Sequence, residues 1–127
     1  MKLKLAFIVQ AKKSFLKLFV LFFFLLFFIS ARISALNYYW VGGTGNWSDL
    51  SHWATTSGGT TLHNQIPTAV DNVFFDGNSF TAAGQIVTLD PLTIFCRDMT
   101  WTGVTNTPAI SSPTSNALRI YGSLIFS

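Results

Sequence analysis

The chain has 127 residues and a formal net charge of +3, but the charges are unevenly distributed. Six basic residues and no acidic residue precede position 36, whereas two arginines and five aspartates follow it, so the later part carries a net charge of −3. A nucleic-acid-binding domain carries its positive charge on the folded part, among aromatic residues. The composition therefore argues against a nucleic-acid partner, and the length allows at most one domain beyond the basic segment.

Residues 1–35 have the pattern of a signal peptide that is cleaved on export. A basic segment precedes the apolar run Leu18–Ile29, and small and polar residues follow, with Ile33-Ser34-Ala35 as an imperfect cleavage site. The run is shorter than the about 20 residues of a membrane-spanning helix. We therefore expect a secreted or cell-surface protein that begins at Leu36 and meets the membrane only through its leader. The alternative is an uncleaved inner-membrane anchor.

The second segment, residues 36–127, is predicted to be all-β. Lys and Glu are absent from it, and Thr, Ser, Asn and Gly make up 39 of its 92 residues. Thr favours strands, while Ser, Asn and Gly favour turns, and no window has the apolar period of a helix. The pattern predicts short strands at 38–41, 72–75, 85–89, 92–96, 99–101, 118–121 and 124–126. Polar loops at 54–69 and 102–116, with Pro67, Pro108 and Pro113, are expected to stay out of central strands.

Short strands joined by polar turns fit a sandwich, a barrel or a stacked coil of parallel strands. No strict internal repeat is visible in the sequence. The chain stops within the apolar strand 124–126, which would leave a strand edge unpaired. We therefore expect residues 36–127 to be the N-terminal piece of a longer protein or a truncated reading frame.

The most distinctive motif places three tryptophans, Trp40, Trp47 and Trp53, around the glycine-rich turn 42–45. In one interpretation the indole rings form a platform for sugar rings, with hydrogen bonds from Asn46, Asp49 and His52. In the other, which we favour, the rings form a structural cap over the first strands. A phosphate-binding loop is disfavoured because neither a helix pattern nor a Lys follows the glycines.

The acidic residues Asp71, Asp76 and Asp90 lie near strand ends, where Asp usually forms turns. Two alternatives remain. A pair of these carboxylates, with Arg97 or Arg119 as the basic partner, could act on a glycoside. Calcium binding is the other, but the spacing matches no calcium loop.

The remaining chemically reactive residues give no clear site. His52 and His63 have no partner at metal-ligand spacing and are expected in loops or at the surface. Cys96 lies in an apolar stretch and is interpreted as a small buried core residue rather than a reactive thiol. Residues 46–48 satisfy the glycosylation sequon, which is weak evidence. No cofactor or metal is predicted.

Two segments carry a resemblance to a known group of proteins. Residues 39–53, with Trp-Val-Gly-Gly-Thr-Gly-Asn-Trp-Ser-Asp and then His-Trp, together with residues 67–80, resemble the opening of large bacterial surface proteins that are exported by the type IX route and associated with gliding. Residues 39–47 are also similar to the openings of autotransporter-like adhesins, and residues 118–124 continue the likeness. The resemblance implies a right-handed parallel β-helix and no catalytic residues. Those proteins are far longer and end in a C-terminal sorting domain, which this chain lacks.

Together these observations predict an exported, non-enzymatic, adhesin-like surface protein that caps and starts a β-helical stalk. Surface glycans or neighbouring cells are the expected partners. A small β-sandwich is the alternative fold. The alternative functions are a carbohydrate-active lyase or hydrolase on a β-helix, and a gene fragment without independent function.

Overall fold

The computed structural model describes Lys17, Phe19, Val20 and residues 34–113 and 115–127. The chain divides into two units, Met1–Ile33 and Ser34–Ser127. Most of the predicted signal peptide therefore lies outside the described residues. Within the residues that are described, no helix has the length and apolar character needed to cross a bilayer.

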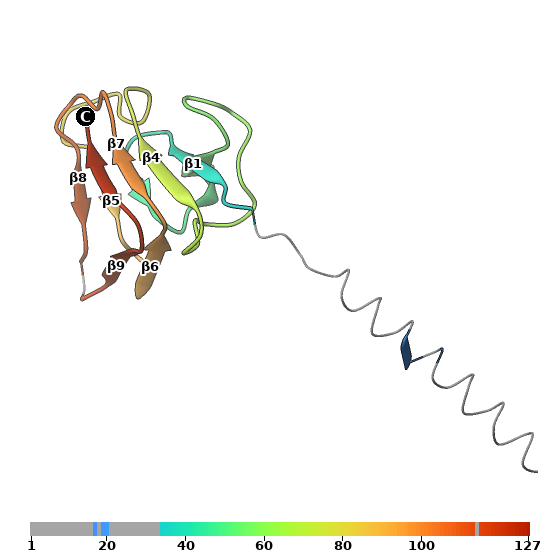
Figure 1. Cartoon of the computed structure of the whole chain (residues 1–127). Helices are drawn as coiled ribbons and strands as arrows, with labels where there is room; N and C mark the ends of the chain where they lie inside the picture. The colour runs from blue at the N-terminus through green and yellow to red at the C-terminus, as the bar shows by residue number, and fades with distance from the viewer. Residues whose placement is uncertain (1–16, 18, 21–33, 114) are drawn as a thin grey trace, which may run out of the picture. The chain divides into compact units, whose positions relative to one another are not determined.

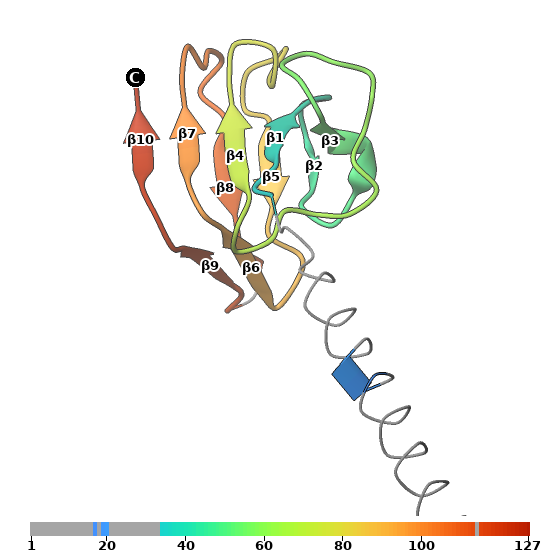
Figure 2. The ribbon, with the colours of Figure 1, turned by 45° about the vertical axis from the view of Figure 1, so that its right-hand side comes forward.

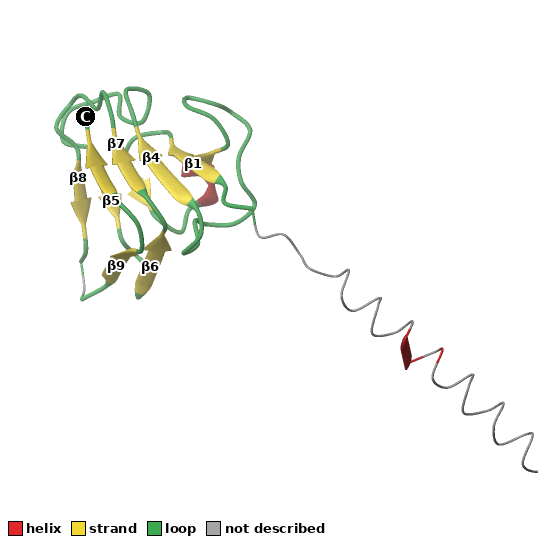
Figure 3. Ribbon diagram, in the orientation of Figure 1, coloured by secondary structure: helices red, strands yellow, loops and turns green. Residues whose placement is uncertain are grey.

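The unit Ser34–Ser127 is built from strands and turns, as predicted (Figure 3). Its only described helical segment is η1, a single 3₁₀ turn at Leu50–His52. The strands are β1 Asn37–Trp40, β2 Gly45–Asn46, β3 Trp53–Ala54, β4 Asn72–Phe75, β5 Ile86–Thr88, β6 Thr93–Cys96, β7 Met99–Trp101, β8 Ala109–Ser111, β9 Ala117–Ile120 and β10 Leu124–Phe126. The all-β prediction is confirmed for this part of the chain.

The strands form three sheets in which most neighbours are parallel. One sheet has the order β10-β7-β4-β1-β3, the second β2-β5-β8, and the third pairs β6 with β9. Figure 2 shows β1, β4, β7 and β10 side by side and pointing the same way, while β6 and β9 lie below them. Only β3 departs from this pattern, because it pairs antiparallel with β1. Two successive stretches of chain, β4-β5-β6 and β7-β8-β9, each contribute one strand to each of the three sheets (Figure 1).

Equivalent positions recur from strand to strand in the stack of parallel strands β1, β4, β7 and β10. Tyr38 aligns with Val73, Val73 with Met99, and Met99 with Leu124. The last two steps are 26 and 25 residues long. The sequence shows no such repeat because the aligned side chains share only their apolar character, and the turns between strands differ in length. The sequence alone therefore did not reveal this recurrence, whose first step, from Tyr38 to Val73, is longer than the later two.

Alternation within each strand directs every second side chain into a shared core. In β6, Ile94 and Cys96 are buried while Thr93 and Phe95 are partly exposed. Ile94 and Cys96 therefore form the apolar, core-facing side of β6. The core joins residues from all three sheets: Tyr38, Trp40, Trp47, Trp53, Val73, Phe75, Phe80, Val87, Leu89, Ile94, Cys96 and Met99.

Three strands lie where none was predicted. β8 lies inside the expected loop 102–116, directly after Pro108, and β2 and β3 span two residues each. β8 is the outermost strand of its sheet. A preceding proline is compatible with such an edge position. The two-residue strands exist because a neighbouring strand holds them in register, and local sequence does not reveal that neighbour.

The two ends of the stack differ. At one end β3 covers the outer edge of β1, and Ala54 bridges onward to Leu62. At the other end β10 pairs with β7 alone, so its second edge is open. Its three side chains, Leu124, Ile125 and Phe126, are 43–71% exposed.

Candidate functional site

The three tryptophans singled out in the sequence meet at the closed end. Trp53 lies between the other two, with ring centroids 4.9 Å from Trp40 and 4.7 Å from Trp47, and both contacts are edge-to-face. The Trp53 Nε1–H donates to the Trp47 carbonyl at 2.8 Å, and the Trp40 Nε1–H donates to the Gly43 carbonyl at 2.7 Å. The cluster is therefore locked by packing and by two indole hydrogen bonds.

Burial separates the two interpretations of these rings. Trp40, Trp47 and Trp53 are each 0% exposed. A sugar stacks on an open ring face, and none of the three offers one in this conformation. Their position at the edge-covered end of the stack agrees with a structural cap.

The glycine-rich turn is shaped by His52, a residue that the sequence placed in a loop or at the surface. The imidazole stacks on the Trp40 ring at 4.5 Å and 5°, and Nδ1 lies 2.6 Å from the Val41 carbonyl. A Cβ added at Gly45 would lie 2.0 Å from His52 Nε2. Gly42 has a positive φ of 82°, which favours glycine. The motif thus combines glycines that admit the imidazole with a tryptophan on which it stacks.

His63 lies in a loop, as predicted, and is half-buried. Its ring stacks on Tyr38 at 3.8 Å, and its Nε2 lies 3.0 Å from the Asn37 carbonyl. The two histidines therefore each stack on a different aromatic ring. The sequence does not indicate the stacking of His63 on Tyr38, because it depends on how the loop that carries His63 folds back onto the first strand.

The acidic residues form loop contacts rather than a shared cluster. Asp71 is 2% exposed and accepts hydrogen bonds from the Leu36 N–H at 2.9 Å and from both the backbone and hydroxyl of Thr68. Asp76 accepts from the Asn78 N–H within its own turn.

Asp90 connects a different pair of loops. It accepts hydrogen bonds from the backbone and hydroxyl of Ser48, 42 residues away. The Asp76 contact is the local one expected of Asp in a turn, whereas Asp90 joins two loops that are distant in the sequence.

The two basic residues considered for the enzyme alternative differ in position: the Arg97 backbone N–H donates to the Asp71 backbone carbonyl at 2.6 Å, but its side chain is engaged by another residue. Arg97 Nε donates to Asp98 at 3.0 Å. Hydrogen bonds from the Ser123 N–H and from Arg97 hold the pKa of the Asp98 carboxyl below its usual value. Arg119 lies on β9 and is exposed. Among the described residues, the ion pair of an arginine side chain joins Arg97 to Asp98 and involves neither Asp71 nor Asp90.

Two further sequence predictions concern metal and thiol chemistry. Within residues 34–113 and 115–127, no three His, Cys, Asp or Glu side chains gather as a metal site would require. Cys96 is fully buried and unpaired, and burial, followed by the nearby Asp98 charge, raises the pKa of its thiol to about 11. The prediction of a buried core cysteine is confirmed, and such a thiol is protonated and unreactive at neutral pH.

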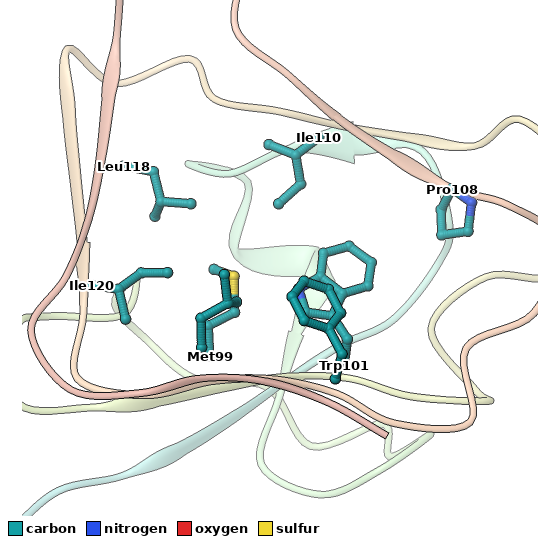
Figure 4. Close-up of a pocket in the computed structure, with 8 residues that line it drawn as sticks. Met99, Trp101, Pro108, Ile110, Leu118 and Ile120 are labelled. Atoms are coloured by element: carbon teal, nitrogen blue, oxygen red, sulfur yellow. The ribbon is translucent and has the colours of Figure 1, made fainter.

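The open end of the stack holds a groove that the sequence did not indicate. It measures about 370 Å³ and is lined by apolar residues of the last four strands and the turn before β8 (Figure 4): Met99, Trp101, Pro108, Ile110, Leu118, Ile120, Leu124 and Phe126. In the sequence, Leu118 and Ile120 flank a polar residue, and residues 124–126 are apolar throughout. Only the strand order shows that the inward faces of these strands are uncovered.

The structure thus contains one closed end with a buried tryptophan cluster and one open end with an apolar groove. Comparison with known proteins adds no relative: no family model, curated protein or solved structure matches this chain.

Proposed function

We propose that this chain is an exported, non-enzymatic surface protein whose β-rich part caps and starts a right-handed parallel β-helical stalk. Its work is adhesion or presentation, with surface glycans or neighbouring cells as partners. One observation carries the proposal. Strands from successive stretches of chain pair in parallel in three separate sheets, and a buried tryptophan cluster closes one end.

The parallel pairing favours a β-helix over a small sandwich. Sandwiches are built from antiparallel strands joined by hairpins and Greek-key connections. Here β1, β4, β7 and β10 are all parallel, as are β2, β5 and β8. The right-handed sense follows from the strong preference of parallel crossover connections for that hand. Antiparallel pairing is confined to β3 and the adjacent bridge at Leu62.

A stalk of this kind displays its turns rather than enclosing a ligand. Thr60, Asn64, Thr102 and Thr105 lie in the two long loops and are exposed. Hydroxyl and amide side chains offer both donors and acceptors to a polar partner such as a glycan. Because the strands hold the loop ends, the loops can vary without disturbing the core.

The carbohydrate-active enzyme remains the second candidate, and the observations favour it less. A glycosidase needs two carboxylates facing one cleft. Asp71 and Asp90 instead accept hydrogen bonds from backbone and hydroxyl groups of separate loops. The groove at the open end is lined by apolar residues alone.

Export is tested by producing the full chain in a bacterial host and separating cytoplasmic, membrane and exported fractions. N-terminal sequencing of the exported material is expected to begin near Leu36. A matched variant with Leu25→Lys and Phe27→Lys, which interrupts the apolar run, is expected to stay in the cytoplasm. Exported or membrane-bound material that begins at Met1 would contradict cleavage and support an anchor.

Adhesion is tested by coupling the exported chain to beads and measuring their binding to a glycan array and to bacterial cells. The loop variant Thr60→Ala/Asn64→Ala is expected to reduce binding while leaving the unfolding midpoint unchanged. The cap variant Trp40→Phe serves as the matched control and is expected to lower the midpoint while folded material still binds. Binding to no glycan and no cell, or glycoside cleavage that Asp71→Asn or Asp90→Asn abolishes, would refute the proposal.

A further inference from the structure

Leu36 and Asp71 lie side by side at the start of two parallel strands. Leu36 directly precedes β1 and Asp71 directly precedes β4, and these strands pair with Asn37 opposite Asn72 (Figure 2). The Leu36 N–H donates to Asp71 Oδ1 at 2.9 Å, and the Leu36 carbonyl accepts from the Asn72 N–H at 2.8 Å. The Leu36 nitrogen is therefore held beside the carboxylate by two hydrogen bonds of the same residue.

The Asp71 carboxylate is buried without a charged partner among the described residues. It is 2% exposed, and its second oxygen, Oδ2, accepts from the Thr68 N–H at 2.9 Å and from the Thr68 hydroxyl at 2.6 Å. The ion pairs in the described part of the chain involve Asp49 and Asp98 instead. A buried charge costs free energy unless an opposite charge lies beside it. Hydrogen bonds from neutral groups offset only part of that cost, so a cation at this place would stabilise the fold.

The predicted processing of the leader would put a cation there. The predicted cleavage site ends at Ala35, so Leu36 is the first residue of the processed chain. Hydrolysis of the bond between them by a leader-cleaving peptidase consumes one water: the leader departs with the Ala35 carboxylate, and the Leu36 nitrogen becomes an α-amino group. Such a group has an ordinary pKa of about 8 and is mostly protonated at neutral pH. The positive charge thus appears on the nitrogen that lies 2.9 Å from Asp71 Oδ1.

We propose that Asp71 is the binding site for the new N-terminus of the processed chain. The Leu36 α-ammonium forms an ion pair with the Asp71 carboxylate and ties the start of β1 to the start of β4. The carboxylate is buried before and after processing, whereas Leu36 is 41% exposed, so the ammonium keeps part of its hydration and the pair gains more than desolvation costs. Removal of the leader therefore makes the folded chain more stable. This inference rests on the cleavage in the proposed function and not on adhesion.

The processed chain allows a direct test because it contains a single amino group. Residues 36–127 contain no lysine, so an N-hydroxysuccinimide ester modifies the Leu36 nitrogen alone. Only a neutral amine reacts, and an adjacent carboxylate keeps the amine protonated by raising its pKa. The processed chain from the exported fraction is expected to react at least about tenfold more slowly at neutral pH than its Asp71→Asn variant. Asp76→Asn is the matched control and is expected to leave the rate unchanged, because Asp76 accepts an N–H within its own turn.

A second measurement isolates the charge without a substitution. Acetylation of the denatured processed chain, followed by refolding, restores an amide N–H at Leu36 that can still donate to Asp71 but carries no charge. The acetylated chain is expected to have a lower urea midpoint, with an unfolding equilibrium constant about tenfold larger in water. In Asp71→Asn, acetylation is expected to leave the midpoint unchanged. The comparison of free and acetylated chain decides the proposal even where Asp71→Asn fails to fold.

The outcomes separate this inference from the predicted cleavage. N-terminal sequencing first establishes where the exported chain begins. In a chain that begins at Leu36, equal reaction rates with and without Asp71, or an unchanged midpoint after acetylation, would overturn the ion pair and leave the cleavage standing. An exported chain that begins at another residue would overturn both.

Discussion

The tryptophan cap allows a paired test of how the closed end is held together. Trp53 and Trp47 are both 0% exposed and pack against each other, but their indole N–H groups differ. The Trp53 Nε1–H donates to the Trp47 carbonyl, whereas the Trp47 Nε1 is buried without a hydrogen-bond partner among the described residues. Replacement of each by Phe removes similar apolar area and therefore isolates the contribution of the N–H group.

Trp53→Phe leaves the buried Trp47 carbonyl without this donor, which costs about 1–3 kcal/mol beyond the loss of packing. Trp47→Phe removes a buried N–H donor that has no partner. The folded state then no longer bears the desolvation cost of that N–H, and this gain offsets part of the packing loss. We therefore expect Trp53→Phe to lower the free energy of unfolding by about 1–2 kcal/mol more than Trp47→Phe does.

The measurement is urea unfolding of the purified chain, followed by circular dichroism. Trp101→Phe is the control, because Trp101 lies at the open end and is partly exposed, and its effect is expected to be the smallest. Equal losses for Trp53→Phe and Trp47→Phe, or a larger loss for Trp47→Phe, would refute the role assigned to the indole hydrogen bond.

Three other outcomes are expected. Gly45→Ala should displace the His52 imidazole and lower the free energy of unfolding by about 1–3 kcal/mol. Gly77→Ala should lower it less, because its added Cβ would come no closer than 3.3 Å to a neighbour. Urea unfolding measures the two free energies, and the His52 ring resonances measure the displacement. Asp98 has a lowered pKa in the folded chain. Its contribution to stability is therefore complete above the unfolded pKa of about 4 and is lost as the pH falls through the folded value. The unfolding midpoint of Asp98→Asn should depend less on pH in acid, and an unchanged acid dependence would contradict this. The folded chain favours the protonated Cys96 thiol, whose pKa is about 11, so stability should fall as the pH rises from about 9 towards 11. At neutral pH, a thiol reagent should label Cys96 only at the rate of unfolding. Rapid labelling of folded protein would contradict the burial of Cys96.

The sequence predicts those strands whose own residues carry the signal. Asn72–Phe75, Met99–Trp101 and Leu124–Phe126 are found at the predicted bounds, because β-branched and aromatic residues there end at glycine or polar turn residues. Ala109–Ser111 lacks that pattern and lies between two prolines, so its strand depends on pairing with Ile86–Thr88. Local propensity does not contain such non-local pairing.

Some features of the candidate site could likewise be predicted from the sequence, and others could not. The sequence indicates that Trp40 and Trp53 belong to one motif, since they flank a glycine-rich turn, and Cys96 is correctly placed in the core by its apolar neighbours. The stacking of His52 on Trp40 was not predictable. It requires the chain to reverse through η1 before β3, which is a tertiary arrangement. The apolar groove was missed for the same reason, since four separate strands contribute to it.

The unequal spacing of the aligned strands has a consequence for evolution. Tyr38 and Val73 pair across 35 residues, whereas Met99 and Leu124 pair across 25, yet both pairs hold the same parallel register. The extra residues of the first interval form β3 and the loop that carries His63. Because the entropy cost of closing a loop grows only slowly with its length, insertions between strands are inexpensive as long as the inward apolar positions are kept. The molecule can therefore acquire or exchange whole surface loops by insertion and deletion while its core stays unchanged.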